Sequence, residues 1–294
     1  MIWSLSLAPL KYNNVTFEKF FESLSTKKHR LLGGEHVFTA NSYLKKELVP
    51  DWKPQNQLYS TCDGSGTSKY KNEAVYKSIS EGLERLAFYQ NHDNVDLGFH
   101  IDCSTTGMAA YPGIFKSYAR RLAYYEAIER WSLQMFWKGL MPIEKLKSIE
   151  GENVFRFKIP FREAVAVLIY RDMTIGQMNR RVYGFASSSN TERALKKSRI
   201  ELDRNFEVFS LVKALDYSTM NLQEKRLVYF SEKSGIDQFD EVCKNALKSK
   251  VQMGKPKILV DSQIMGSWNP YCDIYRVLFE GMSSANTRVD EFLF

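Results

Sequence analysis

The pentapeptide Glu81-Gly82-Leu83-Glu84-Arg85 recurs forty-five positions later as Glu126-Ala127-Ile128-Glu129-Arg130. Both copies fall in stretches whose length and apolar spacing predict long helices, over residues 72–90 and 115–137. Residues three apart lie on one face of a helix, so each copy presents two carboxylates side by side. One such pair is typical of an exposed helix surface. Two copies, each following a turn rich in small residues, indicate a shared chemical role.

Clustered carboxylates repel one another unless a positive charge lies between them. Hard divalent cations prefer oxygen ligands, and magnesium is usually held by a few carboxylates together with substrate phosphates. The turn at residues 63–68, Asp-Gly-Ser-Gly-Thr-Ser, offers backbone amides and hydroxyls to such phosphates. A third helix, predicted over residues 191–215 after a serine-rich cap at residues 187–190, adds Glu201. Taken alone, this third helix fits an amphipathic surface helix equally well.

The rest of the chain alternates between helical and strand patterns. A helix is predicted over residues 15–24, followed by a linker-like stretch at residues 50–58 that contains two prolines. Short apolar runs predict buried strands. They lie at residues 164–171, 181–186, 228–230, 258–260 and 274–279. This alternation predicts a mixed α and β fold.

Composition narrows the class of protein. The 294 residues are 44% hydrophobic and 14% aromatic, which is enough for a large core and excludes intrinsic disorder. The four cysteines lie far apart and the four histidines have no metal-ligand spacing, so neither a disulfide scaffold nor a structural zinc site is expected. No apolar run is long enough to span a bilayer and no signal peptide is evident, so we expect a cytoplasmic protein.

The net charge of +7 comes from short, dispersed basic groups, which favour a mixed solvated surface over a nucleic-acid interface. Aromatic residues on and near the second predicted helix have helical spacing, which favours a place in the core over a peptide-binding groove. They are Tyr124, Tyr125, Trp131, Phe136 and Trp137. Trp268 and Tyr271 are likewise expected to be packing residues, not substrate contacts.

Three motifs in this order resemble the YcaO family. The first is Gly64-Ser65-Gly66 followed by Ala74, Ser78, Glu81, Glu84 and Arg85. The second is residues 104–110 followed by Ala119, Glu126, Glu129 and Arg130, and the third is residues 165–172 and 184–186 followed by Ala194 and Glu201. The resemblance covers residues 55–215, with a late strand at 268–281. It implies an α+β fold with YcaO-like mixed sheets, in which long helices carry the glutamates that bind ATP and magnesium.

The resemblance also implies one YcaO-like domain over residues 1–294. Its parts would be an N-terminal extension (1–54), a motif-bearing core (55–215) and a C-terminal part (216–294). The implied activity is ATP- and magnesium-dependent phosphorylation of a peptide backbone amide, giving an azoline, a thioamide or an amidine in a ribosomally made peptide. The implied metal ligands are Glu81, Glu84, Glu126, Glu129 and Glu201. The implied nucleotide contacts are Ser65, Ser78, Arg130 and Lys197, and no residue identifies the nucleophile.

The chain departs from the family pattern at several positions. Ser65 stands where many members have lysine, Thr106 stands where asparagine is usual, and the last residues, Arg288 to Phe294, are not the proline-rich terminus that peptide cyclodehydratases use. We therefore expect a leader-binding or ThiF-like partner protein besides the precursor peptide, and a homodimer is left open. One alternative is a YcaO-fold subunit that has lost catalysis and serves as a scaffold. Another, an RNA- or ribosome-associated accessory protein, rests only on the net charge.

Overall fold

The computed structural model describes residues 15–53, 57–58, 61–112, 116–147, 151–175, 178–211, 216–283 and 288–292. The chain forms two compact units, which are described here one at a time. Unit 1 comprises residues 1–53, 61–124 and 258–278, and unit 2 comprises residues 54–60, 125–257 and 279–294. Within the described ranges, no helix has both the length and the apolar character needed to cross a membrane.

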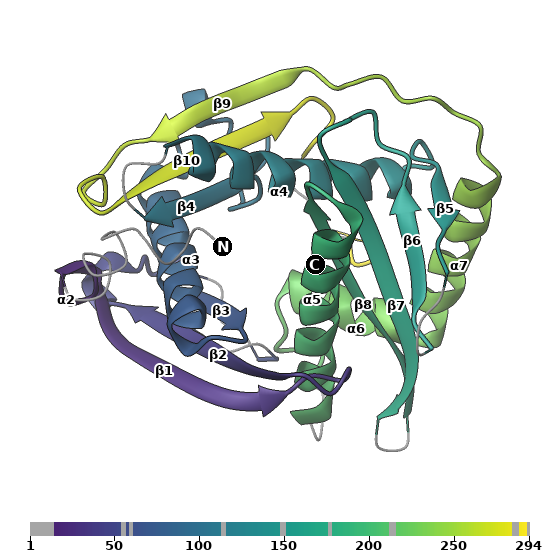
Figure 1. The fold of residues 1–294 in the computed structure, drawn as a ribbon, viewed down its shortest axis with the longest axis horizontal. Helices are drawn as coiled ribbons and strands as arrows, with labels where there is room; N and C mark the ends of the chain where they lie inside the picture. Colours follow the sequence, from purple (N-terminus) through teal and green to yellow (C-terminus); the bar gives the residue numbers. More distant parts are fainter. Residues whose placement is uncertain are drawn as a thin grey trace. The chain divides into compact units, whose positions relative to one another are not determined.

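Unit 1 contains two three-stranded sheets. The first has the order β1-β2-β3, all antiparallel, with β1 at Phe21–Arg30, β2 at His36–Leu44 and β3 at Gly64–Ser68. The short helix α2 (Val15–Phe20) precedes β1, and the long helix α3 (Lys71–Asn91) packs on β2 and β3 (Figure 1). Two 3-10 turns, Lys46–Leu48 and Val95–Leu97, complete this part.

The second sheet of unit 1 has the order β4-β10-β9. Its strands are β4 (Met108–Pro112), β9 (Ile258–Ile264) and β10 (Cys272–Phe279), so the end of the chain's sequence pairs with its middle. One apolar cluster joins α3 to this sheet, and it includes Leu83, Phe99 and Trp268. Trp268 is fully buried, as its expected place in the core requires.

Unit 2 is built on a four-stranded antiparallel sheet of order β5-β6-β7-β8. The strands are β5 (Ile143–Lys145), β6 (Asn153–Phe157), β7 (Val165–Ile175) and β8 (Met178–Ser188), and α5 (Thr191–Leu211) packs on β7 and β8. Helices α6 (Leu222–Ser231) and α7 (Lys233–Lys248) follow. The division between the units falls inside α4 (Lys116–Trp137), between residues 124 and 125.

An aromatic cluster forms the core of unit 2. Trp131 and Phe136 are buried and Trp137 is half-buried within this cluster, which confirms the expected core position of these three residues. Tyr124 and Tyr125 are only half-buried. Phe292 stacks on Trp137 with ring centroids 5.6 Å apart and meets Tyr183 edge to face at 4.9 Å. Such pairs stabilise a core beyond the area that they bury.

The motif-bearing helices are confirmed, with α3, α4 and α5 beginning and ending within two residues of the predicted bounds wherever the structure describes them. Asn190 caps α5, because its side-chain oxygen accepts the amide of Arg193 at 2.9 Å. The strands predicted at residues 164–171, 181–186, 258–260 and 274–279 are also confirmed, as β7, β8, β9 and β10.

Three expectations were wrong. The helix predicted over residues 15–24 ends at Phe20, because the chain from Phe21 onward pairs with β2. The strand predicted at residues 228–230 lies in α6, whose start is fixed by a capping box between Asn221 and Glu224. The flexible turn predicted at residues 63–68 is largely the strand β3, held between β2 and α3. Residues 54–56, within the predicted linker, lie outside the described part of the chain.

Glycines let strands and helices touch through their backbones. A Cβ atom added to Gly64 of β3 would lie 2.0 Å from the carbonyl oxygen of Ser78 on α3. One added to Gly184 of β8 would lie 2.0 Å from the carbonyl oxygen of Ser198 on α5. These contacts involve backbone atoms, which cannot rotate away as side chains do.

We predict that Gly64→Ala lowers the free energy of unfolding by about 1–3 kcal/mol or more, because the methyl group must push β3 away from α3. The matched control is Gly254→Ala, at an exposed glycine with nothing near its Cβ position, which should change stability by less than about 0.5 kcal/mol. Urea unfolding of the three proteins measures both values. Equal stabilities would show that the close approach imposes no constraint.

Candidate functional site

In unit 1 the two motif glutamates of α3 are fixed by strand amides. Glu81 accepts the backbone N–H of Ser65 on β3 at 2.9 Å, and Glu84 accepts that of Ala110 on β4 at 2.7 Å. Glu81 also accepts a bond from the Arg85 guanidinium at 3.2 Å, and its side chain is 30% exposed. One helix therefore holds carboxylates against two different sheets.

Unit 2 repeats this arrangement on a single strand. Glu129 of α4 accepts the backbone N–H of Ser187 at 2.8 Å, and Glu201 of α5 accepts that of Phe185 at 2.7 Å. Both amides belong to β8 and lie two residues apart, so they point to the same side of the strand. Glutamates from two helices therefore meet at one strand.

All four amide donors lie on sheet edges. β3 ends the first sheet, β4 ends the second and β8 ends the sheet of unit 2. The outward N–H groups of an edge strand have no neighbouring strand to pair with. Here glutamates accept them, in charge-assisted bonds that are stronger than neutral ones. The glutamates thus accept outward amides at three strand edges, and a carboxylate can accept more than one bond because it has about four lone-pair sites.

The carboxylates of Glu129 and Glu201 also interact electrostatically. Both residues are half-buried, and desolvation is the main cause that raises the pKa of Glu129 to about 6 and that of Glu201 to about 8. The negative charge of Glu129 raises the pKa of Glu201 further, and the Arg130 guanidinium opposes the shift of both. The exposed Lys197 also opposes the shift at Glu129. The positive charge nearby therefore does not offset the desolvation and repulsion.

The three site helices share one pattern: a buried alanine, a buried small residue four positions later, and a glutamate three positions after that. In α3 these residues are Ala74, Ser78 and Glu81; in α4 they are Ala119, Ala123 and Glu126; in α5 they are Ala194, Ser198 and Glu201. The small residues lie one turn apart on one face of each helix, and in α3 and α5 that face packs closely against β3 and β8. The following glutamate then lies at the edge of that contact.

The other predicted site residues have different settings. Ser78 is buried and its hydroxyl donates to the Gly64 carbonyl at 3.1 Å, so it helps to pack β3 on α3. Ser65 offers its amide to Glu81. Arg130 and Glu126 are half-buried on α4. The roles of these residues and of Lys197 toward a nucleotide stay predictions.

Sequence reasoning missed two features of unit 1. Arg276 of β10 is fully buried over the ring of Phe99 and donates to the carbonyl oxygens of Ser104 and Asp102, at 2.7 and 2.6 Å. It thereby fixes the loop that begins the second motif. The pairing joins residues more than 170 positions apart in the chain, so no local signal could have found it.

The second missed feature is a polar chain behind Glu81. Asp63 pairs with Lys53 at 2.6 Å, accepts the Leu44 amide at 2.9 Å and lies 3.4 Å from the Tyr89 hydroxyl. Desolvation raises the pKa of Tyr89 to about 12. Tyr89 lies one turn after Arg85, which binds Glu81, and this spacing along the helix was the available signal.

The donors suit magnesium bound together with phosphates. Within either unit, the described residues include no group of three histidine, cysteine, aspartate or glutamate side chains able to hold a metal ion by itself. Each unit supplies half-buried carboxylates in small sets, and magnesium usually takes one or two carboxylates plus substrate phosphates. The mutual repulsion of Glu129 and Glu201 is what a divalent cation would relieve.

The arrangement of helices and antiparallel sheets is that of the YcaO proteins, and the chain has a YcaO-like fold. The structure of YcaO from Methanopyrus kandleri bound with AMPPCP and Mg2+ matches with a TM-score of 0.54 and 12% sequence identity, over 90% of this chain and 87% of that one. A heterocyclase in complex with substrate and cofactor matches with a TM-score of 0.53 and 11% identity, over 93% of this chain. The match spans about half, 53%, of that longer chain. No protein-family model and no curated protein sequence matches.

We predict that the metal-free protein loses stability as the pH rises from about 5 to 8, because Glu201 keeps a proton in the folded state that it releases on unfolding. Below about pH 4.5 the Glu201 carboxyl group is protonated in both the folded and the unfolded state, so its raised pKa does not affect stability. Above about pH 8 it is ionised in both states, and the full loss of stability is then present. Glu201→Gln should flatten this slope and stabilise the protein at pH 8.

Urea unfolding in EDTA at several pH values measures this effect. The exposed Glu241→Gln on α7 is the control and should keep the wild-type slope. An unchanged slope in Glu201→Gln would mean that this carboxyl group ionises normally in the folded protein.

Proposed function

We propose that this chain uses ATP and Mg2+ to activate a backbone amide of a peptide. The observation that carries the proposal is the set of motif glutamates on three helices, fixed by edge-strand amides within a YcaO-like fold. The nucleotide and metal named for the Methanopyrus protein and the substrate named for the heterocyclase support it. The chain would therefore bind both a nucleotide and a peptide.

In this proposal Glu81, Glu84, Glu126, Glu129 and Glu201 are the magnesium ligands. When bound, magnesium neutralises the charge of the phosphates during phosphoryl transfer. The strand amides hold Glu81, Glu84, Glu129 and Glu201 in place before any ligand arrives, so little reorganisation is needed on binding. Arg130 and Lys197 add positive charge toward the phosphates, and Ser65 and Ser78 lie on the glycine-rich strand and the helix behind it.

The chemistry proposed is transfer of the γ-phosphoryl group to the amide oxygen after a nucleophile has attacked the amide carbon, followed by loss of phosphate. A cysteine, serine or threonine of the peptide would give an azoline, external sulfide a thioamide, and an amine an amidine. We propose that the substrate is a ribosomally made precursor peptide. A separate leader-binding or ThiF-like protein would deliver it or the nucleophile, so the chain alone would hydrolyse ATP slowly.

One observation favours a second candidate, a scaffolding subunit without catalysis. Ser65 stands where lysine is usual in the family, and its backbone N–H donates a hydrogen bond to Glu81. A phosphate contact at this position would then have to come from another residue. The neighbouring carboxylates argue against this candidate. Half-buried carboxylates that repel one another destabilise the fold unless a bound ligand compensates for the repulsion.

Calorimetric titration of ATP into the purified chain, with magnesium and with EDTA, tests the proposal. Because the phosphates and glutamates need the cation between them, we expect saturable binding only with magnesium. Binding of equal affinity in EDTA contradicts the metal role. No binding in either condition, also after addition of a partner, favours the scaffold.

Glu84→Gln and Glu129→Gln test the ligands. Each variant should lower ATP turnover by at least about a hundredfold, because it removes a charge that positions the metal. Both should remain folded, because a glutamine oxygen still accepts the strand amide. Circular dichroism and thermal melting check the fold, and Glu241→Gln on the exposed face of α7 is the matched control. Wild-type turnover in both variants contradicts the assignment.

A further inference from the structure

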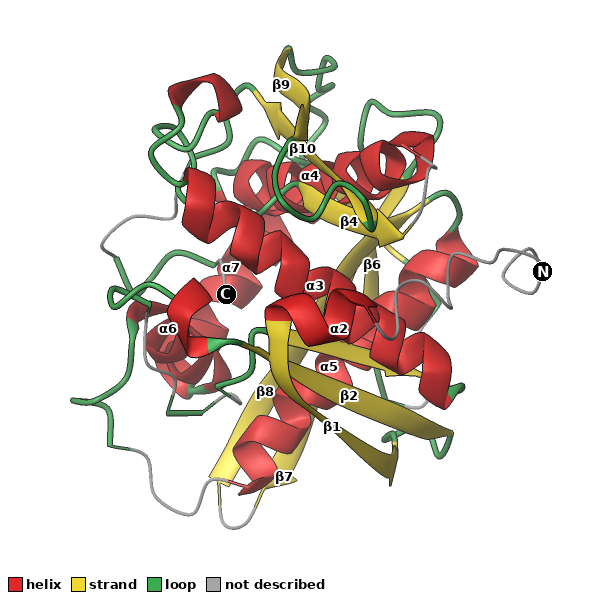
Figure 2. Cartoon of the chain, turned by 90° about the vertical axis from the view of Figure 1, so that its left-hand side faces the viewer, coloured by secondary structure: helices red, strands yellow, loops and turns green. Residues whose placement is uncertain are grey.

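The two edge strands of the β1-β2-β3 sheet differ in what their outward backbone groups bind. The β3 edge receives the carboxylate of Glu81, whereas β1 pairs only with β2 in the part of the chain that the structure describes. Most residues of β1 are exposed, and its register is regular from Ser23 to Arg30, after one irregularity at Glu22. A long regular edge strand is a template for another strand. Figure 2 shows β1 and β2 as long neighbouring strands.

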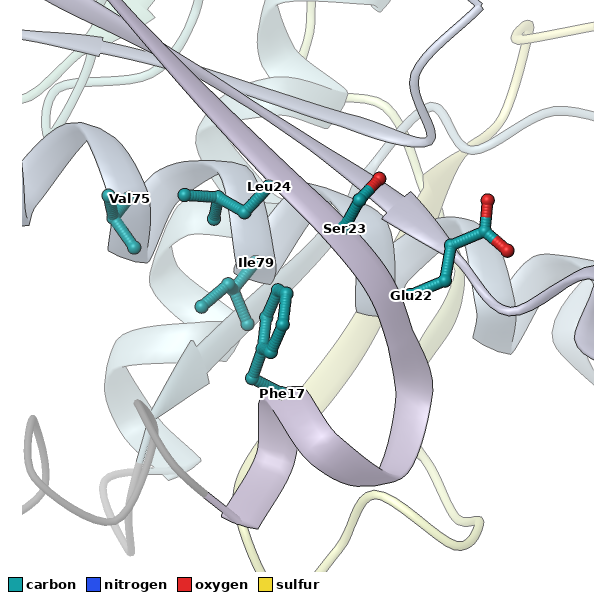
Figure 3. A pocket seen from close by; sticks show the side chains of 6 residues that line it. All are labelled: Phe17, Glu22, Ser23, Leu24, Val75 and Ile79. Carbon is teal, nitrogen blue, oxygen red and sulfur yellow. The ribbon is translucent and has the colours of Figure 1, made fainter.

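An apolar hollow of about 490 Å³ lies beside the start of this edge. Phe17, Leu24, Val75 and Ile79 form its apolar wall, so α2, β1 and α3 all contribute, and the polar residues Glu22 and Ser23 also line it (Figure 3). The carboxylate of Glu22 points away from this apolar group. A strand added outside β1 would place its side chains alternately over this hollow and on the opposite face.

The other end of the edge is basic. Lys27, Lys28 and Arg30 are all exposed. Lys28 and Arg30 share a face with Leu24, because side chains alternate along a strand. The ammonium group of Lys28 lies 5.9 Å from the ring centroid of Phe38 on β2. Positive charges along an edge oppose pairing with a second copy of the same strand and favour an acidic partner.

We infer that β1 binds an extended acidic peptide segment as an added antiparallel strand. The peptide carries acidic residues opposite Arg30 and Lys28 and, four positions after the second of these, an apolar residue that enters the hollow beside Leu24. Antiparallel pairing is the more stable arrangement per residue, and it sets this order of acidic before apolar. Backbone bonds supply affinity, while the hollow and the basic end supply specificity.

The inference rests on the proposed function for the identity of the partner, a segment of the precursor peptide that is to be modified. The binding itself needs no nucleotide. Its test is therefore made without ATP and magnesium, so that a failure of amide activation leaves the result interpretable. A failure of peptide binding likewise leaves the glutamate site intact.

Fluorescence anisotropy with labelled peptides tests the inference. The probe Thr-Glu-Thr-Glu-Thr-Ser-Thr-Leu-Thr fits the predicted order, and we expect saturable binding that weakens as salt rises. Three matched probes should each bind at least about fivefold more weakly: the reversed sequence, a version with lysine in place of glutamate, and a version N-methylated at alternate backbone amides.

Two double variants of equal net charge separate the edge from general electrostatics. Lys27→Glu with Lys28→Glu should weaken binding of the first probe about tenfold. Lys244→Glu with Lys248→Glu, on the exposed face of α7, should change it by less than about twofold. Val75→Gln, which makes the hollow polar, should abolish the preference for leucine over serine at the apolar position of the probe. Thermal melts check that each variant folds.

Three outcomes overturn the inference. They are no binding of the first probe, equal binding of the reversed or N-methylated probe, and equal loss in both double variants. A fourth outcome would assign the edge to a second copy of the chain instead. In it, the first probe does not bind, sedimentation shows that the chain self-associates, and the Lys27→Glu, Lys28→Glu double variant changes that self-association.

Discussion

The bond between a glutamate carboxylate and the outward N–H of an edge strand governs how the candidate site is built. A sheet edge has backbone N–H groups without a strand partner, and burying a carboxylate without hydrogen bonds costs free energy. The bond between them gives the N–H group an acceptor and the carboxylate a donor. The same bond occurs at β3, β4 and β8. In α3 and α5, buried small residues let the helix lie close to a strand that donates these amides.

This bond also explains how acidic groups are tolerated near one another. Each of these carboxylates accepts a bond from a neutral backbone amide, which stabilises its charge without cancelling it, and Glu81 is also paired with Arg85. The pKa of Glu201 is nevertheless raised, mainly by desolvation and further by the charge of Glu129, which α4 brings to the same strand. A divalent cation bound here, as proposed above, would relieve this repulsion.

Much of the site could be predicted from the sequence, because its residues recur at helical spacing on long helices whose caps and lengths are local properties. The amide partners could not, since they depend on which strands lie at sheet edges, and this depends on pairing between distant segments. The apolar run at residues 228–230 favours a strand locally, yet the cap at Asn221 places it in a helix. Phe21 and Leu24 fit a helical period, and pairing with β2 overrides it. The bond from Arg276 to the Ser104 carbonyl could not be predicted either, because only the tertiary structure brings these distant residues together.

The glycine contacts at Gly64 and Gly184 have a consequence for how far such a chain can diverge. Where a strand rests on a helix through main-chain atoms, the distance between them is independent of the volume of the surrounding side chains. Volume-conserving exchanges of core residues elsewhere then leave this helix–strand distance unchanged, and with it the positions of the glutamates that follow on the helix. A fold anchored in this way can be shared by chains that are only 12% identical.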